Sequence, residues 1–262
     1  MIAHPLRVFV RLARGSLMTA MEYRVGFITA LGMSLIDALW AVGGAWVFYS
    51  HRPTLGGWRF HEALLVVGLF FIASGFLDAV LQPSLRELIE GLRTGQLDYI
   101  LIRPMDAMLL ISMRRQRFEK LSSALIGVVL IAVGLSQASA VGGAPLFGFL
   151  VLLGFTLLLL YAAMSLLMAL CFWVVDLTNI EELLLGLLET ARYPVQAFPE
   201  PLRSVLSFVL PIAFISTVPA EMLLGRPNWL LIAYGIAATL ALFALSRLAW
   251  RAALRKYASI GG

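Results

Sequence analysis

Carboxylate side chains within apolar segments are the residues of this chain best placed to do chemistry. Asp37 lies in the middle of one apolar run, and Asp78 lies near the end of another. Glu181, Glu182 and Glu189 share a later segment with helical periodicity. An ionisable group at membrane depth is costly and usually faces a partner chain, a polar path or a proton relay. All except Asp78, which we interpret as solvated at an interface, are therefore candidates for a translocation path or a subunit interface.

The three glutamates have an alternative interpretation. Glu182 and Glu189 are seven residues apart and share a helical face, and Arg192 lies three residues beyond Glu189, where it can form an ion pair. If this helix lies on the cytoplasmic surface, its acids are ordinary surface charges.

Sequence motifs of catalysis are absent. The phosphate-binding pattern G-x-x-x-x-G-K-[ST] requires a lysine after a glycine, and neither Lys120 nor Lys256 follows one. The patterns G-x-S-x-G and H-E-x-x-H are also missing. Cys171 is the only cysteine, and the three histidines are scattered. We therefore expect no enzyme activity, no metal site and no cofactor in this chain.

Composition indicates an integral membrane protein. Hydrophobic residues make up 61% of the 262 residues and charged residues only 13%. The polar exception is 81–120, which holds seven of the 20 Lys/Arg residues and five of the 15 acids. Each charge at the centre of a bilayer costs about 2.5–3.5 kcal/mol, so this stretch must stand in water. Its positive charge places it in the cytoplasm.

An amphipathic helix is predicted within this stretch. Pro83 suits its first turn, and Gly95 suits the position after its end. A further apolar strip at 97–102 ends near Pro104. This helix either rests on lipid headgroups or docks a soluble protein, and the second interpretation is the sharper one. Its apolar face has Leu85, Leu88, Ile89 and Leu92, and its polar face has Arg86, Glu87, Glu90 and Arg93.

Apolar segments long enough to cross a bilayer lie on both sides of the polar stretch. A segment at 4–22 with arginines on one face is instead predicted to lie in the membrane interface. The predicted spans are 25–49, 62–81, 121–135, 146–175 and 228–250.

Two topologies remain open for the segment between the last two of these spans. In one, 178–195 crosses the membrane and 204–224 forms short helices that dip back from the outside. In the other, 178–195 lies on the cytoplasmic surface and 204–224 crosses. Pro211 and Pro219 favour the first as helix breakers, whereas the acids favour the second. Both topologies give six membrane elements with cytoplasmic termini, and both leave 15 of the 20 Lys/Arg residues inside.

Several stretches resemble one known family. R-T-G-Q-L-D-Y-I-L-I-R-P at 93–104 resembles the R-x-G-x-L-D-x-x-L-x-x-P signature of small bacterial ABC-2-type permeases. A-R-Y-P at 191–194, L-P-I-A-F-I-S-T-V-P-A at 210–220 and the basic, Tyr-containing tail at 251–262 are similar to the same branch. The resemblance covers essentially the whole chain.

The resemblance implies an all-α transmembrane permease domain over 1–262 in the bacterial cytoplasmic membrane. It implies a six-element bundle with an N-terminal interfacial helix, a cytoplasmic coupling helix and re-entrant helices at 204–224. It further implies an ABC exporter with two permease chains, identical or related, and two copies of an ATPase that uses ATP and Mg²⁺. The residues implied in docking the ATPase are Leu85, Arg86, Glu87, Leu88, Ile89, Leu92, Arg93, Gly95, Leu97, Asp98, Arg103 and Pro104.

The competing hypothesis is a proton- or ion-coupled carrier that uses Asp37 with Glu181, Glu182 and Glu189. Such a carrier would transport with this chain alone. Many carriers show an inverted repeat between their halves, and none is evident here. The transported substrate is not readable from the spans.

Overall fold

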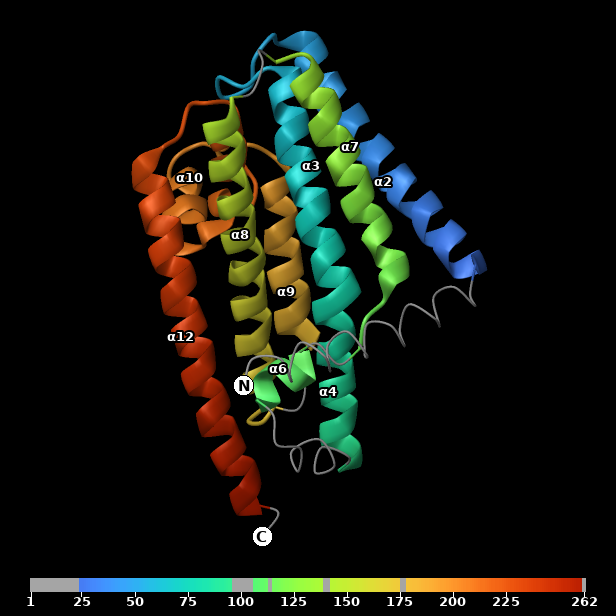
Figure 1. Cartoon of the computed structure of the whole chain (residues 1–262), viewed down its shortest axis with the longest axis vertical. Coiled ribbons are helices and arrows are strands. Elements are labelled where there is room, and N and C mark those ends of the chain that lie inside the picture. Colours follow the sequence, from blue (N-terminus) through green and yellow to red (C-terminus); the bar gives the residue numbers. More distant parts are fainter. Residues whose placement is uncertain (1–23, 96–105, 113–114, 139–141, 175–177, 261–262) are drawn as a thin grey trace.

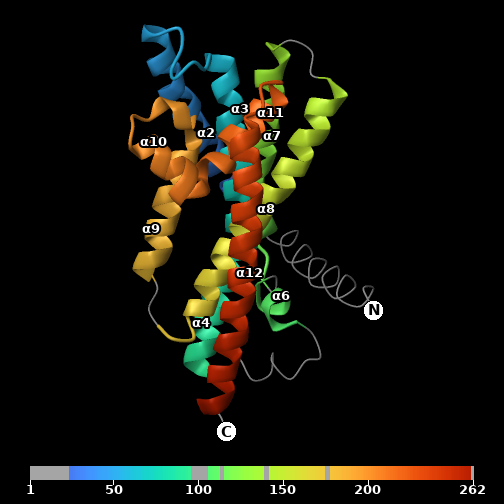
Figure 2. The same cartoon turned by 90° about the vertical axis from the view of Figure 1, so that its left-hand side faces the viewer.

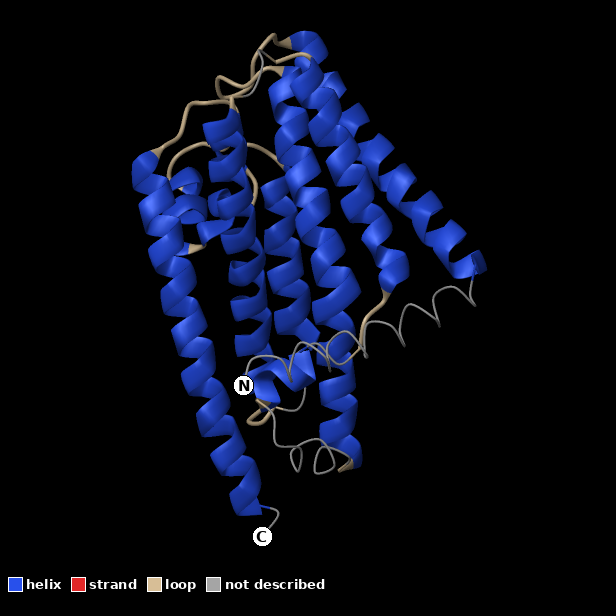
Figure 3. Cartoon of the chain, viewed as in Figure 1, coloured by secondary structure: helices blue, strands red, loops and turns tan. Residues whose placement is uncertain are grey.

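The computed structural model describes residues 24–95, 106–112, 115–138, 142–174 and 178–260. These residues form helices joined by short turns, and no strand occurs among them (Figure 3). The predicted interfacial helix at 4–22 and the docking candidates Leu97, Asp98, Arg103 and Pro104 lie outside the described residues. The chain is an all-α integral membrane protein.

Five stretches of helix in the described part of the chain are long and apolar enough to cross a membrane. Their axes run in broadly the same direction, so they form one bundle (Figure 1). They are Gly26–His51, Phe60–Leu92, Phe118–Ser136, Gly143–Leu170 and Trp229–Tyr257. Most of their residues belong to helices α2 (Arg24–His51), α3 (Phe60–Phe76), α7 (Ser122–Ser136), α8 (Gly143–Leu170) and α12 (Trp229–Ile260).

Helix α3 does not end where the sequence predicts a new amphipathic helix. It continues through a π-helical turn, η1 (Leu77–Leu81), into α4 (Gln82–Thr94). The Gln82 N–H donates to the Leu77 carbonyl, five residues earlier. This wide turn lets the chain remain helical up to Pro83, which has no N–H to contribute. The predicted separate helix is therefore the last part of one helix that starts at Phe60.

Glycines bring α3 and α7 into close contact. A side chain at Gly68 of α3 would lie 2.6 Å from the Gly127 carbonyl oxygen of α7, and one at Gly127 would meet the Gly68 carbonyl in return. Two helical turns after Gly127, a side chain at Gly134 would lie 2.7 Å from the His61 carbonyl oxygen. In lipid, the hydrophobic effect does not drive apolar helices together. Helix pairs are instead stabilised by van der Waals packing, which small residues improve because they let the two backbones approach closely. This pair makes the most extensive helix–helix contact in the described part of the chain.

The segment between α8 and α12 is broken into short pieces. Helix α9 (Thr178–Glu189) runs beside α3 and α8, and the remaining pieces gather near the end of the bundle where α12 begins (Figures 1 and 2). They are η3 (Thr190–Arg192), η4 (Val195–Ala197), α10 (Leu202–Ser204), η5 (Val205–Val209), η6 (Pro211–Phe214) and α11 (Thr217–Leu223). Residues 204–224 therefore form no continuous spanning helix.

Only one of the two predicted helix breakers interrupts a helix. Leu210 is extended, with φ −112° and ψ 104°, and Pro211 starts η6 directly after it. Pro219 instead lies in the first turn of α11, where a missing N–H removes no helical hydrogen bond. The break before α11 falls at Ser216, whose φ is −132° and ψ −49°.

Candidate functional site

Most of the described basic residues gather at one end of the bundle, which we call the basic end. It contains α4, the short helix α6 (Ala107–Ser112), the segment 115–121 and the C-terminal part of α12 (Figures 1 and 2). Both α4 and α12 extend further at this end than α7 and α8 do (Figure 1). Its cations are Arg86, Arg115, Arg117, Lys120, Arg247, Arg251, Arg255 and Lys256.

The apolar face of α4 is covered by this chain itself. Leu85 is 0% and Leu88 2% exposed, in one core cluster with Met108 and Ile111 of α6. Helix α4 contacts both α6 and α8, and Ile89 and Leu92 are also partly buried against this core. Within this chain, Leu85 and Leu88 are therefore already covered, whereas Ile89 and Leu92 remain half-buried, and the docking of these four residues in a groove of a partner stays a prediction. Periodicity shows which face of a helix is buried, but not which chain buries it.

The opposite face of α4 is charged and open. Arg86, Glu90 and Thr94 are exposed, and Glu87 is half-buried. The helix ends as predicted at Gly95, whose φ of +70° a side chain would strain. The side chain of Arg93 lies outside the described residues. A partner that approaches α4 would consequently meet charges and the Gly95 corner.

Helix α6 is fixed to the bundle by polar contacts that the sequence analysis missed. Asp106 accepts a hydrogen bond from the Leu109 N–H at 3.1 Å, which caps α6, and forms an ion pair with Arg247 of α12 at 2.7 Å. Ser112 donates to the Tyr161 hydroxyl of α8 at 3.0 Å. Asp106 and Arg247 are 141 residues apart, and their opposite charge at the predicted cytoplasmic side is the only sequence signal that relates them.

The acidic candidates do not meet at one site. Asp37 is exposed on α2, which lies at the outer edge of the bundle beyond α7, whereas α9 lies on the other side of α3 (Figure 1). In α9, Glu182 is exposed, while Glu181 is half-buried and its Oε1 has no hydrogen-bond partner in the described part of the chain. Glu189 forms the predicted ion pair with Arg192, at 2.8 Å.

Glu189 lies instead near an acid that the sequence analysis treated as solvated. It lines a crevice of about 180 Å³ between α3, α8 and α9, together with Asp78, Ser74 and Gln82. The rest of the lining is mostly apolar, including Phe70 and Leu160. The crevice therefore combines an apolar wall with two carboxylates.

At the opposite end, polar side chains connect the loop before α3 to the segment before α12. The Trp58 Nε1–H donates to Gln196 at 3.0 Å, and the Gln196 amide donates to Glu221 of α11 at 2.7 Å. Arg226 forms an ion pair with Glu62 at 3.2 Å, and its guanidinium lies 4.5 Å from the centre of the Trp58 ring. Burial raises the pKa of Glu221, despite the Gln196 hydrogen bond.

These features define a class of protein. The chain is a multi-pass helical membrane protein in which one helix of the bundle extends into a charged, open segment at a basic end.

Comparison with known families makes the assignment specific. A family model described as "ABC-2 family transporter protein" matches residues 38–261. The chain therefore belongs to the ABC-2 transporter family and is a membrane permease component of an ABC transporter. Neither the curated proteins nor the solved structures include a significant match.

Proposed function

We propose that this chain is the transmembrane half of an ATP-driven exporter, and that a separate ATPase subunit docks at the basic end. A second permease chain, identical or related, completes the translocation path. The observation that carries this proposal is the unbroken helix from α3 through η1 to α4, with a charged face exposed at its end. ATP and Mg²⁺ belong to the ATPase in this proposal.

Helix continuity gives the mechanism of coupling. A helix that stays hydrogen-bonded across η1 moves as one body, so displacement of α4 by a closing ATPase displaces α3 as well. The close contact of Gly68 with Gly127 passes the movement to α7. Exposed Arg86 and Glu90, with half-buried Glu87, determine the register of the partner, since rim charges favour specificity over affinity.

Orientation follows from charge. The basic end faces the cytoplasm of a bacterial cell, because positive residues are retained on that side of the inner membrane. In this arrangement α9 is the fifth membrane element, although its 12 residues are too short to cross the bilayer alone. The pieces from α10 to α11 are re-entrant from the outside, and both termini are cytoplasmic. The crevice that Glu189 and Asp78 line would open toward the path or toward the second permease.

Co-purification with a candidate ABC ATPase subunit from the same organism tests the proposal. The charge swap Arg86→Glu with Glu90→Lys preserves net charge and leaves the buried face of α4 intact. We expect loss of the ATPase from the purified complex while the permease itself stays monodisperse. The control swaps an exposed pair at the opposite end, Glu200→Lys with Arg203→Glu, and should retain the ATPase.

Two outcomes would count against the proposal. One is retention of the ATPase by the α4 charge swap. The other is proton-driven transport by this chain alone in proteoliposomes, which would favour the carrier hypothesis. That hypothesis requires Asp37 of α2 and the acids of α9 to share one path, and these two helices lie on opposite sides of α3 in Figure 1.

A further inference from the structure

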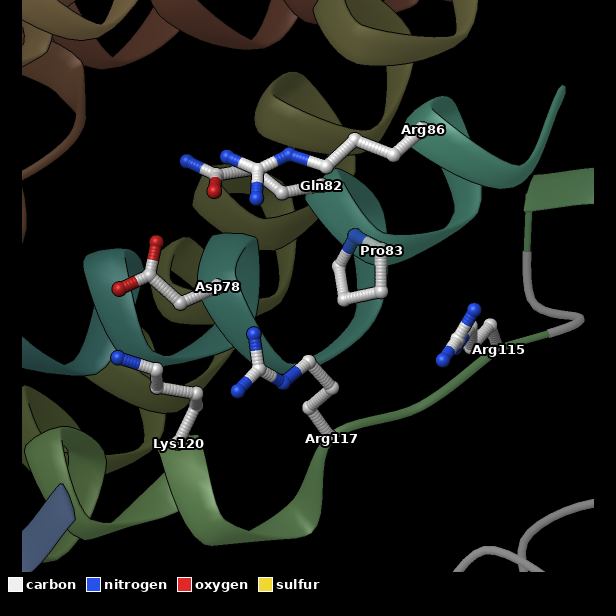
Figure 4. A pocket seen from close by; sticks show the side chains of 7 residues that line it. All are labelled: Asp78, Gln82, Pro83, Arg86, Arg115, Arg117 and Lys120. Atoms are coloured by element: carbon white, nitrogen blue, oxygen red, sulfur yellow. The ribbon is translucent and has the colours of Figure 1, made fainter. Parts of the chain in front are cut away.

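A basic cavity lies beside η1 at the basic end, away from the buried face of α4. Its volume is about 360 Å³. Figure 4 shows Lys120 and Arg117 pointing from the 115–121 segment toward Asp78 of η1, while Arg86 extends across from α4. Four cations and one carboxylate thus face the same space. The lining residues are Asp78, Gln82, Pro83, Arg86, Arg115, Arg117 and Lys120.

Backbone contacts hold the two sides of the cavity together. The Arg117 N–H donates to the Ala79 carbonyl of η1 at 2.7 Å, and the buried Ser84 hydroxyl donates to the Arg115 carbonyl at 3.2 Å. The 115–117 segment is therefore attached to the π-helical turn and to the start of α4. Wide turns of this kind occur frequently at functional sites. The cavity is built into the fold, because its two walls cannot separate without breaking these bonds.

The charge of the cavity is not balanced by its own lining. Arg117 forms an ion pair with Glu119 at 2.8 Å, and Asp78 is the only carboxylate that lines the cavity within the described part of the chain. Arg86, Arg115 and Lys120 add positive charge around the same volume. Clefts lined by one sign of charge concentrate ions of the opposite sign. The cavity therefore favours an anion.

The cavity borders the start of an apolar helical surface. The apolar stretch Phe118–Ser136, which includes α7, starts between the cavity residues Arg117 and Lys120. Further along α7, Leu125, Val128 and Val129 are 57–59% exposed. Basic groups at the cytoplasmic end of spans, followed by an apolar helical surface, match an anionic headgroup followed by an acyl chain.

We propose that this cavity binds the phosphate headgroup of an anionic phospholipid. Arg117 and Lys120 contact the phosphate oxygens from one wall and Arg86 from the other, since guanidinium and ammonium donors form the strongest hydrogen bonds to phosphate. Arg115 contributes long-range attraction from the rim. Asp78 opposes the phosphate and limits its affinity. Because the lipid would contact η1 and α4 together, its binding stabilises the junction through which α3 and α4 move as one.

Lipid titration of the purified full-length chain in detergent tests this proposal. Native mass spectrometry would count bound phosphatidylglycerol against phosphatidylcholine, whose headgroup has no net charge. We expect selective phosphatidylglycerol binding that Arg117→Gln with Lys120→Gln weakens by at least about tenfold. The control, Arg251→Gln with Arg255→Gln, removes the same charge from α12 and should change the affinity less than about twofold.

Asp78→Asn provides a change of opposite sign. Removing the opposing carboxylate should tighten phosphatidylglycerol binding, whereas a merely structural role of Asp78 would weaken it or leave it unchanged. Equal losses in the cavity variant and in the α12 control would overturn the proposal, because attraction would then follow total charge. Undiminished binding in the cavity variant would overturn it as well.

Competition between inorganic phosphate and phosphatidylglycerol shows whether the bound phosphate belongs to a soluble compound or to a lipid. If inorganic phosphate at low millimolar concentration occupies the site and phosphatidylglycerol does not, the ligand is a soluble phosphate compound and the lipid assignment is overturned. If the cavity variant loses the ATPase but binds lipid like the wild type, the cations dock an acidic protein segment instead. The lipid assay uses the permease alone, so its outcome is independent of whether the ATPase docks on α4.

Discussion

The two ends of the long helix that joins α3 to α4 satisfy their polar groups differently. At the α3 end, Glu62 meets both the Arg59 N–H, at 2.8 Å, and Arg226, and Trp58 lies against the same arginine. At the α4 end, basic side chains face a cavity and an open surface, with one carboxylate among the cavity's lining residues in the part of the chain that the structure describes.

This difference separates structural charges from functional ones. Paired and hydrogen-bonded groups are the usual way to keep polar residues near a membrane, and they fix loops in place. Cations that outnumber the acids around a cavity leave a net positive charge, which attracts an anion or an acidic partner. We therefore assign the α3 end to stability and the α4 end to binding, with the glycine contact between α3 and α7 as the scaffold common to both.

The largest effect is expected from breaking that scaffold. Gly127→Leu forces α7 away from the Gly68 carbonyl and should cost about 3 kcal/mol or more. In detergent, the melting temperature should fall by roughly 6–12 °C for a chain of this size. Both ends of the helix should lose function together, which differential scanning fluorimetry and ATPase co-purification would show.

Gly44→Leu is the matched control for this prediction. A side chain at Gly44 of α2 would have no atom within 4 Å, so the substitution should leave the melting temperature nearly unchanged. If Gly127→Leu melts like the wild type, the close contact between α3 and α7 does not carry the scaffold.

A smaller effect is expected from pH at the α3 end. Burial raises the pKa of Glu221, so its stabilising contribution is complete below the pKa of the unfolded chain and is lost as pH rises through the folded pKa. Glu221→Gln removes this titration and keeps an oxygen that can accept from Gln196. Between pH 5 and pH 8, the wild type should lose about 2–4 °C more in melting temperature than the variant. Parallel pH profiles would show that Glu221 titrates normally.

The smallest effect is expected at the ion pair that attaches α6 to α12. Asp106 and Arg247 are about one-third exposed, so a double-mutant cycle should give a coupling of roughly 0.2–1 kcal/mol. Asp106→Ala should cost about 1 kcal/mol more than Asp106→Asn, because asparagine retains the cap of α6. A coupling energy well above this range would show that the Asp106–Arg247 pair stabilises the fold in the way that the polar contacts at the α3 end do.

Local patterns predicted much of the fold. Apolar run lengths indicated the long helices, and Gly95 marked the end of α4 because its backbone conformation is left-handed. Two features depended on tertiary packing and escaped prediction. The wide turn at η1 accommodates Pro83 within a continuous helix, and α6 of the same chain packs against Leu85 and Leu88. The Asp106–Arg247 pair shows the same limit, since nothing local relates residues so far apart in sequence.

Site-specific photocrosslinking from α4 tests the central claim most directly. A photoreactive residue at Glu90, exposed on the charged face, should crosslink to the ATPase in membranes that contain both subunits. The same residue at Arg203, near the opposite end, should give no such product. A crosslink from position 90 alone would establish α4 as the docking helix. A product from position 203 without one from position 90 would contradict both the docking surface and the orientation of the chain.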